Sequence, residues 1–237
     1  MKVLFVFAHP DDETFSSGGT IRKLVNSGAI VKLITATTGQ AGQYGEVKVN
    51  SPEHLGEIRK KELEAASKVL GISEIFYLGL YDGELIKQKT TFLTQKILEI
   101  IEKEEPDIVV TFEKHGGSNH PDHKKISKAA TSAFKEYIKK SKKYVKLYHT
   151  VSPRSYLKKY ADIGLLNTGF GNPKGVSDKE ITTFVDISDV YQDKDRAARC
   201  HITQAADWER FLKRAQHVNL KMEYFKLIEE NSFFLIP

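Results

Sequence analysis

The sequence has a single cysteine, Cys200, among 237 residues. One cysteine excludes an internal disulfide framework and a cysteine-based zinc finger, and it suits a reducing compartment. No apolar run approaches the ~20 residues that a membrane-spanning helix needs. The apolar start, residues 2–8, is too short for the hydrophobic part of a signal peptide. These absences predict a cytoplasmic protein with no membrane span.

The sequence also has little excess of one sign of charge over the other. Lys and Arg number 36 against 31 acidic residues, for a formal net charge of +5. The densest basic cluster, residues 135–146, is typical of a solvated helix end, with an anionic partner as the alternative. So small a surplus does not predict a nucleic-acid partner. The chain is 40% hydrophobic and has no repeat or linker, so we expect a single domain over residues 1–237.

Short apolar runs alternate with helical patterns along most of the chain. They predict strands at 2–8, 30–37, 75–78, 107–112, 146–151 and 182–187, and helices at 16–27, 53–70, 92–102, 122–140, 189–204 and 208–227. Strand–helix–strand units of this length join parallel strands. The order predicts an α/β fold with a mostly parallel, doubly wound sheet. Residues 153–179 have no assignable pattern, and the apolar tail, 233–237, is expected to dock.

Two of the expected strands are followed by the same three residues, His-Pro-Asp. Residues 2–8 lead into His9-Pro10-Asp11-Asp12-Glu13, and residues 107–112 lead through a glycine-bearing loop to His120-Pro121-Asp122-His123. The carboxyl ends of parallel strands lie at one edge of a sheet, where open α/β folds bind ligands. We therefore expect the two motifs to converge. The polar loop 38–52 should hang over the same edge, as a lid or as a merely flexible connection.

The two motifs contain the ligands of a catalytic zinc site. Two imidazoles and one carboxylate, here His9, Asp12 and His123, commonly bind zinc and leave the fourth position to water. Such a site lowers the pKa of that water to about 7 and polarises a carbonyl group. Asp11, beside a ligand, is placed to take the proton. This is the chemistry of amide or ester hydrolysis.

His120 and Asp122 form a second pair. A histidine that a carboxylate holds protonated is a suitable donor to a tetrahedral oxyanion. The alternative is that Asp122 caps the helix expected to begin there, and that the carboxylates after His9 only favour a helix N-terminus. The occurrence of one motif at two strand ends favours the metal site.

Other residues have weaker signals. Arg59 and Glu62 are three apart, as in a surface ion pair. Gly18 and Gly19 would let a phosphate approach a helix N-terminus, but the spaced glycines of a dinucleotide site are missing. By spacing alone, His201 and Gln204 are packing or surface residues.

The stretch from Ala8 to Glu13, together with His120 to His123, resembles the zinc-dependent N-acetylglucosaminyl deacetylases, the LmbE-like or PIG-L-like family. Residues 58–66 resemble the second-helix pattern of that family. His201-Ile202-Thr203-Gln204 resembles its C-terminal His-x-Ser-Gln signature, with Thr203 in place of Ser. The similarity thus extends over residues 8–204.

This resemblance implies a Rossmann-like fold with the metal at the C-terminal edge of the sheet. It implies one Zn²⁺ per chain, with Fe²⁺ as the alternative. The implied metal ligands are His9, Asp12 and His123. The other implied site residues are Asp11 as general base, His120 supported by Asp122 as oxyanion donor or acid, and Arg59 facing the pocket.

The implied substrate is a small N-acetylglucosamine conjugate whose aglycone the sequence does not specify, and a homo-oligomer is compatible with the resemblance. Two other functions stay open. One is a phosphoesterase or nucleotide-processing enzyme with a second metal, for which Glu13 and Asp122 are the spare ligands. The other is a sugar-binding protein without catalysis.

Overall fold

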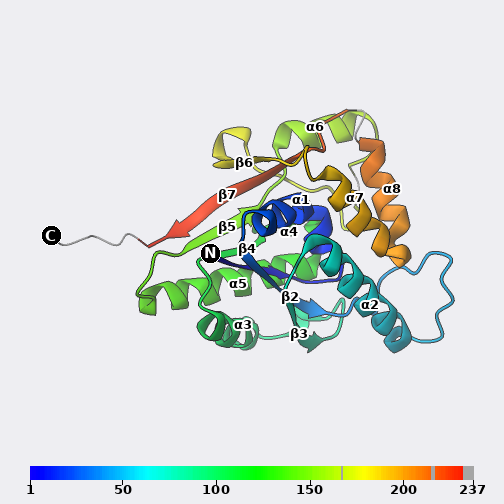
Figure 1. Ribbon diagram of the computed structural model, residues 1–237. Coiled ribbons are helices and arrows are strands. Elements are labelled where there is room, and N and C mark those ends of the chain that lie inside the picture. The colour runs from blue at the N-terminus through cyan, green and yellow to red at the C-terminus, as the bar shows by residue number, and fades with distance from the viewer. Residues whose placement is uncertain (167, 215–216, 232–237) are drawn as a thin grey trace.

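The computed structural model describes residues 1–166, 168–214 and 217–231. They form a seven-stranded sheet in the order β3-β2-β1-β4-β5-β7-β6 (Figure 1). The strands are β1 Lys2–Phe7, β2 Ile30–Thr37, β3 Glu74–Leu80, β4 Ile108–Phe112, β5 Lys146–Thr150, β6 Thr183–Asp186 and β7 Met222–Glu230. Neighbouring strands from β3 to β5 are parallel, whereas β7 runs antiparallel to both β5 and β6. The predicted mostly parallel α/β sheet is confirmed.

Helices cover both faces of this sheet (Figure 1). They are α1 Asp12–Asn26, α2 Pro52–Leu70, α3 Thr90–Glu104, α4 Gly116–Asn119, α5 Pro121–Lys140, α6 Arg154–Asp162, α7 Tyr191–Cys200 and α8 Ala205–Lys213. Right-handed crossovers place α1 and α2 on one face and α3 and α5 on the other. In agreement, α7 packs against α1 and α2, and α3 packs against α5. The order in which strands are added to the sheet reverses between β1 and β4, and ligands bind at this point in such sheets.

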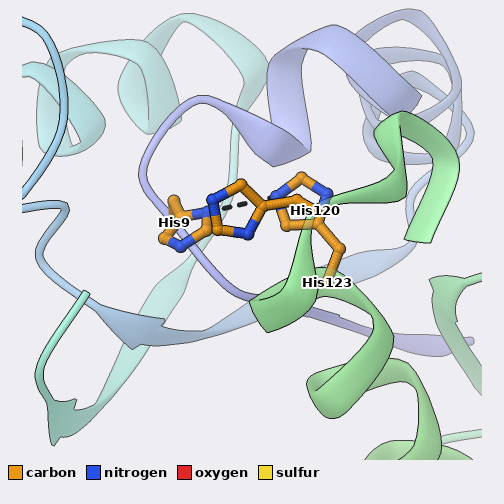
Figure 2. A group of neighbouring side chains, drawn as sticks. All are labelled: His9, His120 and His123. Carbon is orange, nitrogen blue, oxygen red and sulfur yellow. Dashed lines mark hydrogen bonds between the residues drawn. The ribbon is translucent and has the colours of Figure 1, made fainter. Parts of the chain in front are cut away.

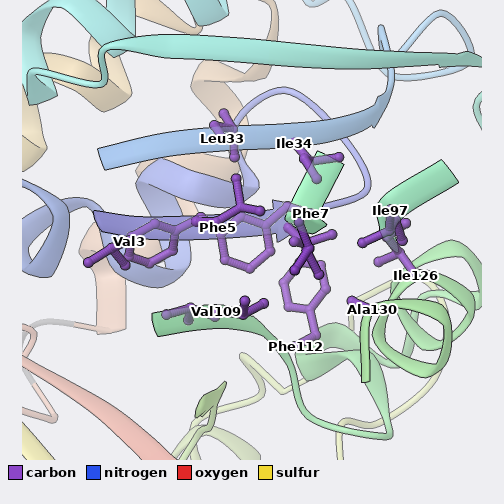
Figure 3. Close-up of a cluster of buried hydrophobic side chains, with 14 of the residues drawn as sticks. Val3, Phe5, Phe7, Leu33, Ile34, Ile97, Val109, Phe112, Ile126 and Ala130 are labelled. Carbon is purple, nitrogen blue, oxygen red and sulfur yellow. The ribbon is translucent and has the colours of Figure 1, made fainter. Parts of the chain in front are cut away.

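Strand β1 lies at the centre of the core. Phe5 and Phe7 are fully buried, as expected for a parallel strand that is covered on both faces. The ring of Phe7 packs against that of Phe112 at the end of β4, with 4.7 Å between centroids (Figure 3). This packing fixes the ends of β1 and β4 relative to each other, and both functional motifs begin at these ends.

The expectations for the last third of the chain need correction. The predicted helix at 208–227 is wrong, because α8 ends at Lys213 and residues 222–230 form β7. Strand β7 pairs with β5 on one edge and β6 on the other, and its alternate residues Glu223 and Phe225 are buried. This pairing and burial override the helical propensity of the stretch. Residues 153–179, left unassigned, contain α6. The expected docking of 233–237 lies outside the described residues.

Two local expectations also differ from the structure. Helix α5 begins at Pro121 and is capped by the side chain of His120, which accepts from the backbone N–H of Asp122. Asp122 is therefore not the cap, since proline takes the first helical position. At Gly19 a Cβ would lie 2.5 Å from Ile187, so this glycine permits helix packing. No helix in the described part of the chain is both long and apolar enough to span a membrane.

Candidate active site

Side chains from the ends of β1 and β4 converge on one point. Nδ1 of His9 lies 3.1 Å from Nε2 of His123, and that Nε2 lies 3.2 Å from Oδ1 of Asp12. His9 Nδ1 and Asp12 Oδ2 are 3.7 Å apart. Ligand atoms on a tetrahedral zinc with bonds of 2.0–2.1 Å are about 3.3 Å apart. The first two distances are close to this value, and the third, which runs to the other Asp12 oxygen, is longer. The three predicted ligands therefore lie close together, and Figure 2 shows the imidazoles of His9 and His123 beside that of His120.

The outward nitrogen of each imidazole is already engaged. His9 Nε2 lies 2.8 Å from Oδ1 of Asp82, and His123 Nδ1 lies 3.0 Å from the carbonyl oxygen of Gly116. The ring of His123 also stacks on Phe112, with 4.3 Å between centroids. An outward N–H that donates to oxygen leaves the inward nitrogen with a lone pair. The tautomers required for metal binding are thus set by the surroundings.

Asp12 is held by the turn that it follows. Its Oδ2 accepts from the backbone N–H of Ala8 at 3.1 Å and of His9 at 2.8 Å. Its Oδ1 is thereby directed toward His123.

Burial alone would lower the pKa of His9, but the carboxylates of Asp122, Asp82 and Asp12 raise it to about 10. These carboxylates create a negative potential that favours a cation.

Two other groups of described side chains, each of which includes His9, also have possible ligand atoms within 4.8 Å of one another. One is His9, His120 and His123, and the other is His9, Asp82 and Asp122. The Asp122 oxygens accept from the backbone N–H groups of Gly83, at 2.7 Å, and Leu85, at 3.1 Å. Asp122 also lies 3.3 Å from His9 Nε2. We therefore interpret Asp82 and Asp122 as supports for His9.

Asp11 lies beside this point in an unusual backbone conformation. Its φ of 101° is in a region that residues other than glycine rarely adopt. Its N–H donates to Oε2 of Glu13 at 3.0 Å, and its Oδ2 accepts from Nη2 of Arg59 at 3.0 Å. Burial raises the pKa of Asp11 to about 7, although the charge of Arg59 opposes the shift. A carboxylate with a pKa near neutrality suits a general base.

Arg59 is not part of a surface ion pair. It is 3% exposed, and it donates to the carbonyl oxygens of Pro10, at 2.7 Å, and Gly39, at 3.0 Å, as well as to Asp11. A Cβ at Gly39 would lie 2.3 Å from the guanidinium, so only glycine allows this approach. Arg59 lines the cavity, as the resemblance implied, and it fixes the turn that carries Asp11.

A buried pair, Glu13 and His201, lies behind Asp11. His201 Nε2 is 3.1 Å from Oε1 of Glu13, and both side chains are inaccessible to solvent. Thr203 donates to Glu62 through its N–H and its hydroxyl, at 2.8 and 2.7 Å. Gln204 donates to the carbonyl oxygen of Gln43 at 2.7 Å. The late His-x-Thr-Gln sequence therefore connects α1, α2 and the loop after β2 through polar contacts.

His120 is held differently from the expectation. Its Nδ1 accepts from the backbone N–H of Asp122 at 3.1 Å, whereas the Asp122 carboxylate bonds elsewhere. Burial, together with the neighbouring imidazoles, lowers the pKa of His120 to about 3. The imidazole is thus neutral, with its proton on Nε2. A neutral N–H can still donate to an oxyanion.

A cavity of about 740 Å³ opens over this edge, a size typical of ligand pockets. Residues 41–43 of the loop after β2 line it beside the catalytic motifs. Its opposite wall includes Tyr156 and Tyr160 of α6, Phe211 of α8, and Phe170. The ring of Phe170 contacts His120, with 4.0 Å between centroids. The expected placement of the 38–52 loop over the edge holds for these residues.

Sequence reasoning missed Asp82. The residue comes directly after β3, a third strand of the same parallel group. Applying the strand-end argument to that strand as well would have identified it. The opposite wall of the cavity, the far wall with Tyr156, Tyr160, Phe170 and Phe211, had no such signal in the sequence.

Comparisons with known proteins agree with this geometry. The profile of the PIG-L family, described as GlcNAc-PI de-N-acetylase, matches residues 4–134. A 1D-myo-inositol 2-acetamido-2-deoxy-alpha-D-glucopyranoside deacetylase of Actinosynnema mirum is 30% identical over 236 residues, covering 88% of this chain and 82% of that protein. A probable N-acetyl-alpha-D-glucosaminyl L-malate deacetylase 2 of Bacillus cereus is 39% identical over 132 residues, covering 55% of this chain and 60% of that protein.

A solved structure is also similar. The N,N'-diacetylchitobiose deacetylase of Pyrococcus horikoshii superposes with a TM-score of 0.67 at 25% sequence identity, covering 96% of this chain and 83% of that one. The family profile covers more than half of the present chain, and it includes both histidine motifs. The chain belongs to the PIG-L family of deacetylases.

Proposed function

We propose that this protein is a zinc-dependent hydrolase with one metal per chain, which removes acetate from the N-acetyl group of an N-acetylglucosamine conjugate. The observation that carries the proposal is the convergence of donor atoms from His9, Asp12 and His123, with His123 Nε2 3.1 Å from His9 Nδ1 and 3.2 Å from Asp12 Oδ1, and with Asp11 beside them. The relatives named as deacetylases of glucosaminyl inositol and glucosaminyl malate support the substrate class.

His9, Asp12 and His123 would hold the metal. A zinc ion bound there would polarise the acetamide carbonyl and acidify a water molecule. The site's donor set suits this ion, because each imidazole directs an unprotonated nitrogen inward and the carboxylate adds negative charge.

Asp11 would act as the base through the oxygen that does not bind Arg59. That oxygen takes a proton from the attacking water and later delivers it to the leaving amine. Arg59 and Glu13 fix the orientation of Asp11 by holding its carboxylate and its backbone N–H. Preorganisation of this kind spares the reorientation of the base during reaction.

His120 would stabilise the negative charge that develops on the carbonyl oxygen. Its Nδ1 is occupied by the N–H of Asp122, so Nε2–H is the donor in the neutral ring. Because the low pKa keeps the ring neutral, it would contribute a hydrogen bond and not a proton.

Acetate release from a panel of N-acetylglucosamine conjugates, with inositol, malate, or a second sugar as aglycone, tests the proposal. Release that stops with chelator and returns with zinc is the expected result. The absence of release from every conjugate would refute the deacetylase function. Release that is indifferent to chelator would refute the metal dependence.

A further inference from the structure

The cationic side chains around the cavity differ in one respect, which is whether a carboxylate balances them. Arg59 pairs with Asp11 at 3.0 Å, Lys194 pairs with Glu223 at 2.6 Å, and Arg210 pairs with Asp207. Arg214 also lines the cavity, but no carboxylate of the described residues forms an ion pair with it. Within the described residues, the far wall therefore has one cation without an ion-pair partner, which the Asp207 carboxylate attracts only at longer range.

The Arg214 guanidinium is fixed in place even though no described carboxylate lies within ion-pair distance of it. Its Nη2 donates to the carbonyl oxygen of Leu165 at 2.9 Å, and its central carbon lies 4.6 Å from the ring centroid of Tyr160. Its Nε is buried and has no hydrogen-bond partner among the described residues. Burial lowers the pKa of Arg214, so the charge is partly desolvated. A donor with these properties is prepared for an external acceptor.

We infer that Arg214 binds an anionic group, a carboxylate or a phosphate, on the aglycone of the substrate. The inference rests on the proposed function, because it assigns the catalytic edge of the cavity to the N-acetylglucosamine unit. The same continuous cavity reaches the wall formed by α6 and the end of α8. A planar guanidinium matches both oxyanions geometrically.

The neighbouring apolar residues favour this assignment over a purely solvated arginine. Tyr160, Leu157 and Leu220 are buried in a small second core, against which Phe211 packs. They form one side of the cavity wall and exclude water from one face of the guanidinium. An anion bound there would be screened less than one bound at an exposed lysine.

Two matched substrate pairs test the inference. The first is N-acetylglucosaminyl L-malate against its dimethyl ester, and the second is an N-acetylglucosaminyl inositol phosphate against the unphosphorylated conjugate. Within each pair only the anion differs. We expect kcat/KM to be higher for the anionic member of at least one pair by about 10- to 100-fold, the range for a hydrogen bond to a charged group. The pair with the larger ratio identifies the oxyanion.

Variants of Arg214 locate this preference in the structure. In Arg214→Gln the ratio of kcat/KM values should fall to about 1. Only kcat/KM for the anionic substrate should decrease, mainly through a rise in KM. Arg214→Lys should retain part of the ratio, because it keeps the charge but not the planar fork. Lys213→Gln, which removes the same charge from the adjacent exposed position, serves as the matched control and should keep the wild-type ratio.

The outcomes separate the inference from the function on which it rests. Wild-type protein that releases acetate equally from both members of each pair overturns the inference and leaves the deacetylase function intact. So does an Arg214→Gln variant that keeps the wild-type ratio, or that loses activity on neutral and anionic substrates alike. Failure of the wild type to release acetate from any conjugate overturns both.

Discussion

The parallel and the antiparallel part of the sheet contribute different parts of the cavity. Strands β1 to β5 are parallel, and the proposed metal ligands and base lie after the ends of β1 and β4. The antiparallel β7, with α6 and α8, supplies the opposite wall, where the aromatic residues and Arg214 lie. The proposed chemistry is thus concentrated at the ends of parallel strands, and the proposed substrate contacts are distributed over the later, less regular segments.

The first prediction separates the base from the metal ligands within the β1–β4 edge. Asp11→Asn should lower kcat by about 10²–10⁴-fold, the contribution of a general base, and should leave metal content unchanged. His123→Ala is the contrasting variant and should lose both metal and turnover. Metal analysis beside acetate-release kinetics measures this difference. Wild-type turnover by Asp11→Asn would remove Asp11 from the mechanism.

The second prediction concerns the connection between the two regions. Lys194 of α7 donates to the Phe15 carbonyl oxygen of α1 at 3.0 Å and pairs with Glu223 of β7. Glu223 in turn accepts from the Gly19 and Thr20 N–H groups. Lys194→Met should lower the free energy of unfolding by about 3–5 kcal/mol, because it leaves a buried carboxylate unpaired. Denaturant unfolding measures the loss.

Two further variants control for this effect. Lys23→Met removes an exposed ion pair with Asp189 and should change stability far less, since solvent screens such pairs. The double variant Lys194→Met with Glu223→Gln should recover part of the loss. If Lys194→Met were as stable as Lys23→Met, the buried pair would not connect the two regions.

The third prediction tests how β3 supports the metal site. Asp82→Asn weakens the acceptor for the His9 Nε2–H and should reduce metal affinity by about 10- to 100-fold, the usual effect of a support for a ligating histidine. Competition with a chromophoric chelator measures the affinity. Replacing Glu84, a half-exposed residue of the same turn whose partner is Lys87, should leave it unchanged. Equal affinities for the two variants would contradict the assigned role of Asp82.

The fourth prediction concerns β5, the border between the two regions. Burial lowers the pKa of His149 from 6.5 to about 4. Between these pH values the unfolded chain binds a proton that the folded protein does not, so stability falls as pH falls from about 6.5 to about 4. The slope is at most about 1.4 kcal/mol per pH unit. His149→Gln should have a shallower slope.

Denaturant unfolding of the wild type and of His149→Gln at pH values from about 6.5 to about 4 measures how the stability of each depends on pH. Chelator is present throughout, so that metal release does not contribute. Parallel slopes would show that His149 is protonated equally in the folded and unfolded states.

Sequence reasoning succeeded where the functional residues are local to a strand end. The repeated His-Pro-Asp sequence predicted that His9 and His123 converge, because parallel strands end at one edge. The same reasoning placed Asp11 and Asp12. It failed for Arg59, whose partners Pro10 and Gly39 belong to other segments, since helical spacing reveals only neighbours on the same helix.

The far wall could not be predicted for a related reason. Its residues come from α6, in a segment with no assignable pattern, and from the end of α8, whose continuation was interpreted as further helix instead of the strand β7. The helical interpretation of 208–227 removed that strand from the predicted sheet. Without β7, no pattern placed Arg214 near the cavity.

The central claim is that one metal ion, held by His9, Asp12 and His123, supports deacetylation at this edge. Titration of zinc into metal-free protein, followed by acetate release from an N-acetylglucosamine conjugate, tests it most directly. The account predicts that activity rises linearly and reaches its plateau at one zinc per chain. A plateau at two metals per chain, or no acetate at any zinc content, would contradict it.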